Sequence, residues 1–286
     1  MSTPVLSDPL SPDLGAVLEA WRLAVLADKT QVEALPDRPD PSDFYAPVAE
    51  QFRADPRRAG DPSLEHLRSL VEPGDSWLDL GAGGGRYTLP LALRAKRVYA
   101  VEPSSGMRQV LASAATDAGV TNLDVFDERW PGPSRCPVAD CGLISQVGYD
   151  IADIGPFLEQ FEAHVSRMCV AMLFEGAPIS DFGVLWRPVH GEDRHLLPGL
   201  REFITLLLAR GRLPEIRLFE TPRAVFDSLD SLHRTARRPL WVKEGTDQDE
   251  RLQQAIASIA VPVDNGYVLR RGPRMLGVVT WRPAGP

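Results

Sequence analysis

The chain has 286 residues, a formal net charge of -8 and three cysteines, none of them in a C-x-x-C pair. This length is enough for one large domain, or for one domain with an elaboration, to bury its own hydrophobic core. The acidic balance argues against a general affinity for nucleic-acid backbones, and three cysteines are too few for a disulfide framework.

The segment before the first expected strand is predicted to be helical. Asp13 has the position of an N-cap for a helix over residues 14–27, whose apolar side chains recur on one face. A proline-rich linker follows, and a short helix is expected over residues 44–52. Another helix starts at Asp61–Pro62, where proline suits the first helical position, and runs to about residue 70.

Strands and helices then alternate regularly as far as residue 174. This alternation is typical of a parallel sheet with helices on both faces, and right-handed crossovers bring the carboxyl ends of the strands to one edge. Ser104 is in position to cap the helix expected over residues 104–117. The expected strands cover residues 77–80, 97–101, 123–126, 140–145 and 169–174, and the expected helices cover 87–93, 104–117 and 155–168.

A glycine-rich turn directly after the first strand is the most specific pattern in the chain. Asp79 lies in that strand, and Gly81, Gly83 and Gly85 follow in the spacing G-x-G-x-G. Glycine adopts positive φ without strain and lets a ligand lie directly against the backbone. Glu102 comes 21 residues after Gly81, at the end of the second strand, where a carboxylate can accept hydrogen bonds from both ribose hydroxyls. The combination predicts a site for an adenosine-containing cofactor.

The alternation becomes less regular after residue 175. Residues 176–198 are predicted to be a loop-rich insertion, followed by a helix over 200–210, a strand over 216–220 and two helices near 224–234 and 248–258. Two strand-like runs within 266–281 indicate a hairpin around Gly272–Pro273. We therefore divide the chain into an N-terminal helical cap segment (1–60), a cofactor-binding core (61–175), a cap or insertion with helices and one core strand (176–262), and a C-terminal hairpin that completes the sheet (263–286).

The glycine turn resembles motif I of the class I S-adenosylmethionine-dependent methyltransferases. Its spacing, with Arg86 next, differs from the G-x-G-x-x-G/A of dinucleotide folds, which makes an NAD-dependent oxidoreductase the poorer interpretation. The resemblance implies an α/β fold with a Rossmann-like, mostly parallel seven-stranded sheet, an antiparallel terminal strand and helical cap elements. It also implies S-adenosylmethionine as the cofactor. By resemblance, the binding residues are Asp79, Gly81, Ala82, Gly83 and Gly85 at the methionine half, Glu102 at the ribose, and Pro103 and Met107 against the adenine.

The contact to the adenine amino group is the point at which the chain departs from this family. Many members place an acid after the third strand, whereas Arg129 stands at that position here. Asp127, or a backbone amide beside Trp130, is the remaining candidate for this contact.

Candidates for contact with a methyl acceptor come from two regions. Gln146 and Tyr149 follow the fourth strand and are expected at the mouth of the site, although either can instead support its own loop. Tyr45 precedes the first strand, where members of the family often close an aromatic ring over the cofactor; ordinary packing is the alternative. The Asn/Asp-Pro-Pro-Tyr motif of enzymes that methylate adenine or glutamine amino groups is absent.

The richest polar cluster outside the glycine turn contains His190, Glu192, Asp193 and His195. Such a cluster can deprotonate a hydroxyl or bind a divalent metal, but a solvated surface loop is the preferred interpretation, and we predict no metal site. His190 is also a candidate for substrate contact. His190 and Tyr149 are the candidates for a general base, which methyl transfer needs only if the nucleophile must lose a proton.

These patterns predict a methyltransferase that acts on O, N or C of an unidentified small molecule. The alternatives are an RNA or protein methyltransferase, which the acidic charge disfavours, and a non-catalytic protein that binds S-adenosylmethionine. No apolar run approaches the roughly 20 residues that span a bilayer, and the first residues lack a signal-peptide pattern. We therefore expect a cytoplasmic protein without nucleic-acid or membrane partners, and leave its oligomeric state open.

Overall fold

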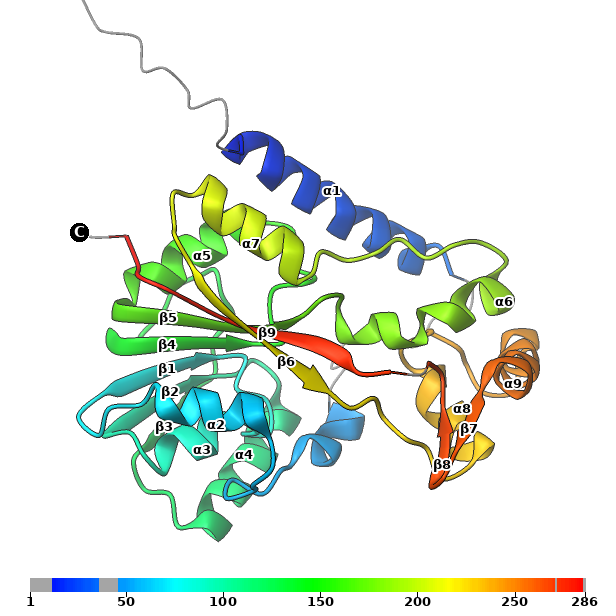
Figure 1. The fold of residues 1–286 in the computed structure, drawn as a ribbon, viewed down its shortest axis with the longest axis horizontal. Coiled ribbons are helices and arrows are strands. Elements are labelled where there is room, and N and C mark those ends of the chain that lie inside the picture. The colour runs from blue at the N-terminus through cyan, green and yellow to red at the C-terminus, as the bar shows by residue number, and fades with distance from the viewer. Residues whose placement is uncertain (1–11, 36–45, 271, 285–286) are drawn as a thin grey trace, which may run out of the picture.

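The computed structural model describes residues 12–35, 46–270 and 272–284. Its main strands are β1 (Ser76–Leu80), β2 (Arg97–Val101), β3 (Leu123–Phe126), β4 (Ala139–Ser145), β5 (Val165–Phe174), β6 (Glu215–Thr221) and β9 (Arg274–Trp281). They form one seven-stranded sheet in the order β3-β2-β1-β4-β5-β9-β6 (Figure 1). The strand β9 is antiparallel to both of its neighbours, and the other pairings are parallel. The predicted Rossmann-like sheet with one antiparallel strand is confirmed.

Helices cover both faces of the sheet (Figure 1). One face carries α1 (Leu14–Glu33), α5 (Ile154–Ala163) and α7 (Leu200–Ala209). The other face carries α2 (Pro62–Ser69), α3 (Thr88–Ala92) and α4 (Ser105–Ala118). The central strands are therefore buried on both sides. In β5, Cys169, Ala171 and Leu173 join the first core cluster, whereas Val170 and Met172 join the second.

The predicted helix starts are confirmed at three N-caps. The carboxylate of Asp13 accepts a hydrogen bond from the backbone N–H of Ala16, 2.7 Å away, at the start of α1. Asp61 caps α2, with proline at the first helical position, and the hydroxyl of Ser104 caps α4. The helix α1 extends beyond the predicted end at residue 27, as far as Glu33.

A second group of elements lies beyond the carboxyl edge of the sheet (Figure 1). It consists of α6 (Trp186–His190), α8 (Leu229–Arg237), α9 (Asp247–Ile259) and the hairpin of β7 (Val261–Val263) with β8 (Gly266–Val268). These elements, which we call the cap, bury a hydrophobic cluster of their own that includes Trp186, Leu232 and Leu252. The helix α7 and the strand β6 pack with the sheet and lie outside this cluster. The predicted division of the chain into segments stays a proposal.

Three sequence predictions differ from the structure. The C-terminal hairpin around Gly272–Pro273 is wrong, because β8 pairs with β7 and β9 enters the main sheet between β5 and β6. The helix expected over residues 155–168 ends at Ala163, and β5 begins at Val165. Residues 176–198, predicted to be a loop-rich insertion, contain the 3-10 helix η2 (Pro178–Leu185) and the short helix α6. No helix in the described ranges is long and apolar enough to cross a membrane.

Candidate cofactor site

The glycine turn connects β1 to α3 at the carboxyl edge of the sheet. Gly81 and Gly83 have φ values of 72° and 54°, in the left-handed region that favours glycine. A Cβ on Gly81 would lie 2.4 Å from Cγ2 of Val147, so the loop after β4 packs directly against the turn. A Cβ on Gly83 would meet nothing nearer than the Gly81 carbonyl oxygen at 4.0 Å. The bare backbone of Gly83 therefore faces open space, as close approach of a ligand requires.

The carboxylate of Glu102 is held beside this turn, at the carboxyl end of β2. Its Oε2 accepts a hydrogen bond from the backbone N–H of Gly83, and its Oε1 accepts one from that of Ser104, both at 2.8 Å. The side chain is only 6% exposed. These bonds fix the orientation of the carboxylate between the glycine turn and the first residues of α4. The acid and the glycine backbone, which the sequence predicted to act together, are thus in direct contact.

Asp79 lies beneath the turn and supports it from inside. It is 2% exposed, and its Oδ2 accepts a hydrogen bond of 2.6 Å from the hydroxyl of Thr88 at the start of α3. Burial raises the pKa of the Asp79 carboxyl group from 3.8 to about 7; the Thr88 hydrogen bond opposes this shift, and the charge of Glu102 adds to it. The predicted contact of Asp79 with a cofactor stays a prediction, and its contacts in this structure are with the protein.

The domain that carries this site matches a known family. Residues 78–172 match the family model described as "Methyltransferase domain". These residues form a methyltransferase domain.

Individual proteins are similar to this chain over part or most of its length. A crystal structure of a SAM-dependent methyltransferase from Thiobacillus denitrificans, solved with S-adenosylhomocysteine, is similar with a TM-score of 0.54 at 14% identity, covering 86% of this chain and 99% of that one. An uncharacterized protein of Haemophilus influenzae is 35% identical over 92 residues, which are 30% of this chain and 34% of that protein. A probable ribosomal RNA small subunit methyltransferase A of Pyrobaculum aerophilum is 33% identical over 85 residues, 29% of this chain and 35% of that protein. The chain thus spans about a third of the length of these two curated relatives.

The residues predicted for adenine contact lie on α4 and in the segment after β3. Met107 is buried against Ala49 of the 3-10 helix η1 (Ala46–Phe52), whereas Pro103 is exposed. Asp127 forms a two-pronged ion pair with Arg108, with both N–O distances at 2.8 Å. Arg108 also donates a hydrogen bond to the Glu102 carbonyl oxygen. The Asp127 carboxylate, predicted for the adenine amino group, is therefore engaged by a guanidinium.

The remaining predicted cofactor residues of the methyltransferase domain have structural contacts. Trp130 is buried, and its ring centroid lies 4.7 Å from that of His164. Ala82 is buried in the cluster between α3 and α4. A Cβ on Gly85 would lie 2.7 Å from Cδ1 of Leu111, so this glycine allows tight helix packing. Their contacts with a cofactor stay predictions.

The loop after β4 differs from the sequence prediction at Tyr149. Its phenol is 5% exposed; it donates to Oε1 of Gln146 and accepts from the backbone N–H of Phe174, both at 2.8 Å. Burial raises the pKa of this phenol further above its ordinary value. The Gln146 side chain donates to the Met172 carbonyl oxygen at 3.0 Å. Tyr149 therefore joins the ends of β4 and β5 from inside the core, which is the supporting role that the sequence left open, and its predicted contact with a methyl acceptor stays a prediction.

Gln146 also has strained backbone geometry. Its φ of 58° is in the left-handed region, which a residue other than glycine adopts at a cost. This conformation directs the chain so that Val147, the next residue, contacts Gly81. The strain is thus located where the loop after β4 meets the glycine turn.

The polar cluster of the sequence prediction is divided among different partners. His190 packs on Trp186, and its Nε2 lies 2.9 Å from the carbonyl oxygen of Leu240. Burial lowers the pKa of the His190 imidazole, and the bond from Nε2 to the carbonyl oxygen places the proton on that nitrogen. This nitrogen is therefore engaged and is not the atom of a general base. No group of three His, Cys, Asp or Glu side chains that could hold a metal ion occurs among the described residues.

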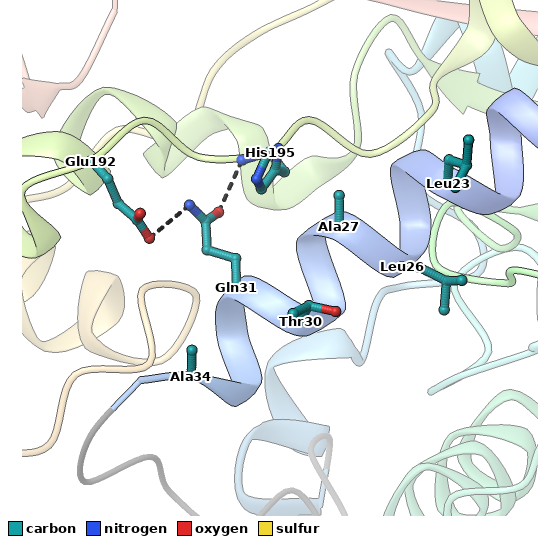
Figure 2. A pocket seen from close by; sticks show the side chains of 8 residues that line it. All are labelled: Leu23, Leu26, Ala27, Thr30, Gln31, Ala34, Glu192 and His195. Atoms are coloured by element: carbon teal, nitrogen blue, oxygen red, sulfur yellow. Dashed lines mark hydrogen bonds between the residues drawn. The ribbon is translucent and has the colours of Figure 1, made fainter.

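Glu192 and His195 lie along a surface groove beside α1 (Figure 2). The groove has a volume of about 450 Å³, and apolar side chains that include Leu26 and Ala27 line it. The side chain of Gln31 donates to Glu192 and accepts from the backbone N–H of His195, at 2.9 Å each. Asp193 instead forms an ion pair with Arg187. Glu192 and the backbone of His195 therefore contact α1, whereas the side chains of His190 and Asp193 bond elsewhere, so the four polar side chains do not converge on one point.

Sequence reasoning missed two residues that hold the site together. Thr88 bonds Asp79 beneath the turn, and Arg108 links Asp127 to the end of β2. Thr88 follows the glycine turn directly, which is a usable signal for a residue that supports it. Arg108 carries no such signal, because its partner is 19 residues away. Tyr45, the predicted lid, lies outside the described residues.

Proposed function

We propose that the protein transfers the methyl group of S-adenosylmethionine to O, N or C of a small molecule. The observation that carries this proposal is the open backbone of Gly83 beside the oriented carboxylate of Glu102. S-Adenosylmethionine is the cofactor of class I methyltransferase domains, and when bound it supplies a methyl group on a sulfonium centre. The residues fit this group, because a carboxylate suits ribose hydroxyls and bare backbone suits the methionine half.

The protein's own contribution is binding and positioning. Glu102 would hold the ribose, and Gly81 and Gly83 would allow the methionine half to lie against the turn. Asp79 and Thr88 keep the turn in place from below. Methyl transfer is an in-line displacement, so a large share of the rate enhancement can come from fixing donor and acceptor and excluding water. No general base is needed when the acceptor atom need not lose a proton to react.

Two features support a small molecule as the acceptor. The net charge of -8 disfavours a phosphate backbone, whose binding depends on clustered Lys and Arg side chains. The cap lies beyond the carboxyl edge of the sheet, where it can enclose an acceptor of limited size (Figure 1). An RNA acceptor is the second candidate, since one curated relative is named as a probable ribosomal RNA methyltransferase, although that match covers 29% of this chain.

Calorimetry tests the cofactor assignment. We expect S-adenosylmethionine and S-adenosylhomocysteine to bind and NAD(H) not to bind. Glu102→Ala should weaken binding, because each lost charge-assisted hydrogen bond contributes about 1.5 to 3 kcal/mol. Asp124→Ala is the matched control, because this acid pairs with Arg97 on the neighbouring strands β3 and β2. An unchanged affinity in Glu102→Ala would refute the ribose assignment.

Methyl transfer itself is tested with labelled cofactor. Radiolabel from the methyl group should appear in the small-molecule fraction of a metabolite extract and not in ribosomal RNA. Label in the RNA fraction would favour the second candidate. Cofactor binding without transfer to either fraction would indicate a non-catalytic binding protein.

A further inference from the structure

Three segments that connect the sheet with the cap are joined by one ion-pair cluster. Asp181 lies in η2 after β5, Arg223 follows β6, and Arg274 begins β9. The Asp181 carboxylate pairs with Nη1 of Arg223 through one oxygen and with Nη1 of Arg274 through the other, both at 2.6 Å. The cluster therefore lies where the chain passes between sheet and cap.

The charges in this cluster do not balance. Two guanidinium groups share a single carboxylate, which leaves one positive charge in a chain whose net charge is -8. Arg274 lies over the ring of Phe174, with its guanidinium carbon 3.8 Å from the ring centroid. Its Nε is buried and has no hydrogen-bond partner among the described residues, although 21% of the side chain is exposed. The protein thus leaves part of the donor capacity of Arg274 unused.

A series of contacts connects this cluster to the glycine turn. Val147 packs on Gly81, and the preceding residue, Gln146, bonds Tyr149. Tyr149 in turn accepts a hydrogen bond from the backbone of Phe174, the ring that Arg274 covers. The strand β9 lies two strands from β4. In the register of the sheet Val278 of β9 is level with Ser145 at the end of β4, and Arg274 lies four residues further along β9. With about 4.8 Å between strands and about 3.3 Å per residue along a strand, Arg274 begins about 16 Å from the end of β4.

We propose that Arg274 and Arg223 bind a carboxylate carried by the methyl acceptor, at the end opposite to the methylated atom. This inference rests on the proposed methyltransferase function. A carboxylate can accept parallel hydrogen bonds from a guanidinium, and the excess positive charge of the cluster complements it. The ion pairs with Asp181 hold both guanidinium groups at the edge of the sheet before the ligand arrives. The acceptor is accordingly a small acid.

The test compares two probes of similar shape, one with a charged carboxylate and the other with a neutral amide in its place. The protein loaded with S-adenosylhomocysteine is titrated by calorimetry with 4-hydroxycinnamate and with 4-hydroxycinnamamide, whose hydroxyl lies at the far end from the acid or amide. We expect the acid to bind roughly 10-fold to 100-fold more tightly than the amide. Arg274→Met retains an apolar contact with Phe174 but removes the charge, and it should abolish this preference. The absence of a preference in the wild-type protein, or its persistence in Arg274→Met, would overturn the proposal.

A second variant separates ligand binding from a purely structural role. Asp181→Asn removes the negative charge that competes for both guanidinium groups, while its amide oxygen can still accept a hydrogen bond that holds them in place, so it should strengthen binding of the acid. If the cluster only stabilised the fold, Asp181→Asn and Arg274→Met would both weaken binding, and that result would also overturn the proposal. Binding of S-adenosylhomocysteine is measured first in every variant. If the wild-type protein does not bind S-adenosylhomocysteine, the proposed function is refuted. If it binds S-adenosylhomocysteine but does not prefer the acid to the amide, this inference alone is refuted.

Discussion

The buried carboxyl group of Asp79 should make the stability of the domain depend on pH. Its pKa is about 7 in the folded chain and 3.8 in the unfolded reference, a difference of about 3 units. Each unit corresponds to about 1.4 kcal/mol, so ionisation of Asp79 costs the folded state about 4 kcal/mol. Below about pH 4 the group is protonated in both states and imposes no cost. Between pH 4 and pH 7 the unfolded state ionises first, and the free energy of unfolding falls as the pH rises.

Asp79→Asn removes this titration while retaining a hydrogen-bonding side chain next to Thr88. Urea unfolding without cofactor, followed by tryptophan fluorescence between pH 5 and pH 8, gives the free energy of unfolding of both proteins. The variant should gain stability relative to the wild-type protein as the pH rises, and the difference should level off above pH 7. Thr88→Val is the matched control, because losing the hydroxyl that stabilises the ionised form should shift the transition to higher pH. Parallel pH profiles for the wild-type protein and Asp79→Asn would refute the reasoning.

Three further predictions concern the core, the turn and the cap. Glu162→Gln should lower the free energy of unfolding by about 3 kcal/mol, measured with urea, because its buried carboxylate pairs with Arg212 at 2.7 Å. Gly83→Ala should lower the free energy of unfolding by only about 1 to 2 kcal/mol because of its positive φ, but it should weaken S-adenosylmethionine binding, measured by calorimetry, about tenfold or more. Gly119→Ala is the control, because Gly119 also has a positive φ, of 70°, and free space for a Cβ. It should lower the free energy of unfolding by a similar amount and leave binding unchanged. The His190 imidazole should titrate with a pKa below its ordinary value of 6.5, measured by NMR. The free energy of unfolding should therefore fall as the pH falls through this range, because the unfolded state binds the proton more readily. A titration midpoint at or above 6.5 would contradict the effect of burial.

The sequence predicted the parts of the site that depend on local signals. The turn from Gly81 to Gly85 and the position of Glu102 follow from residue spacing, and three helix starts follow from side-chain caps. The alternation of strands and helices is equally local, because each crossover joins neighbouring parts of the chain.

Features set by tertiary contacts were not predictable. The strand β9 alternates Leu276 and Val278 with Val279 and Trp281 toward opposite core clusters, which is the pattern of a central strand. A hairpin around Gly272 was inferred only because turn residues stood between two apolar runs. The burial of Tyr149 depends on the left-handed backbone of Gln146, which nothing in the sequence indicates.

The helix α1 contacts both the sheet side of the molecule and the cap. In its first half, the indole N–H of Trp21 donates to the carbonyl oxygen of Ile151 on the sheet side. Near its end, Val32 joins the hydrophobic cluster of the cap. Asp28, between them, forms an ion pair of 2.8 Å with Arg194. A helix behaves as a stiff rod, so the cap cannot swing away from the sheet unless α1 tilts or releases one attachment. Movement of the cap away from the sheet should therefore be limited by the strength of these contacts. Asp28→Ala should weaken one of them without changing the predicted cofactor site.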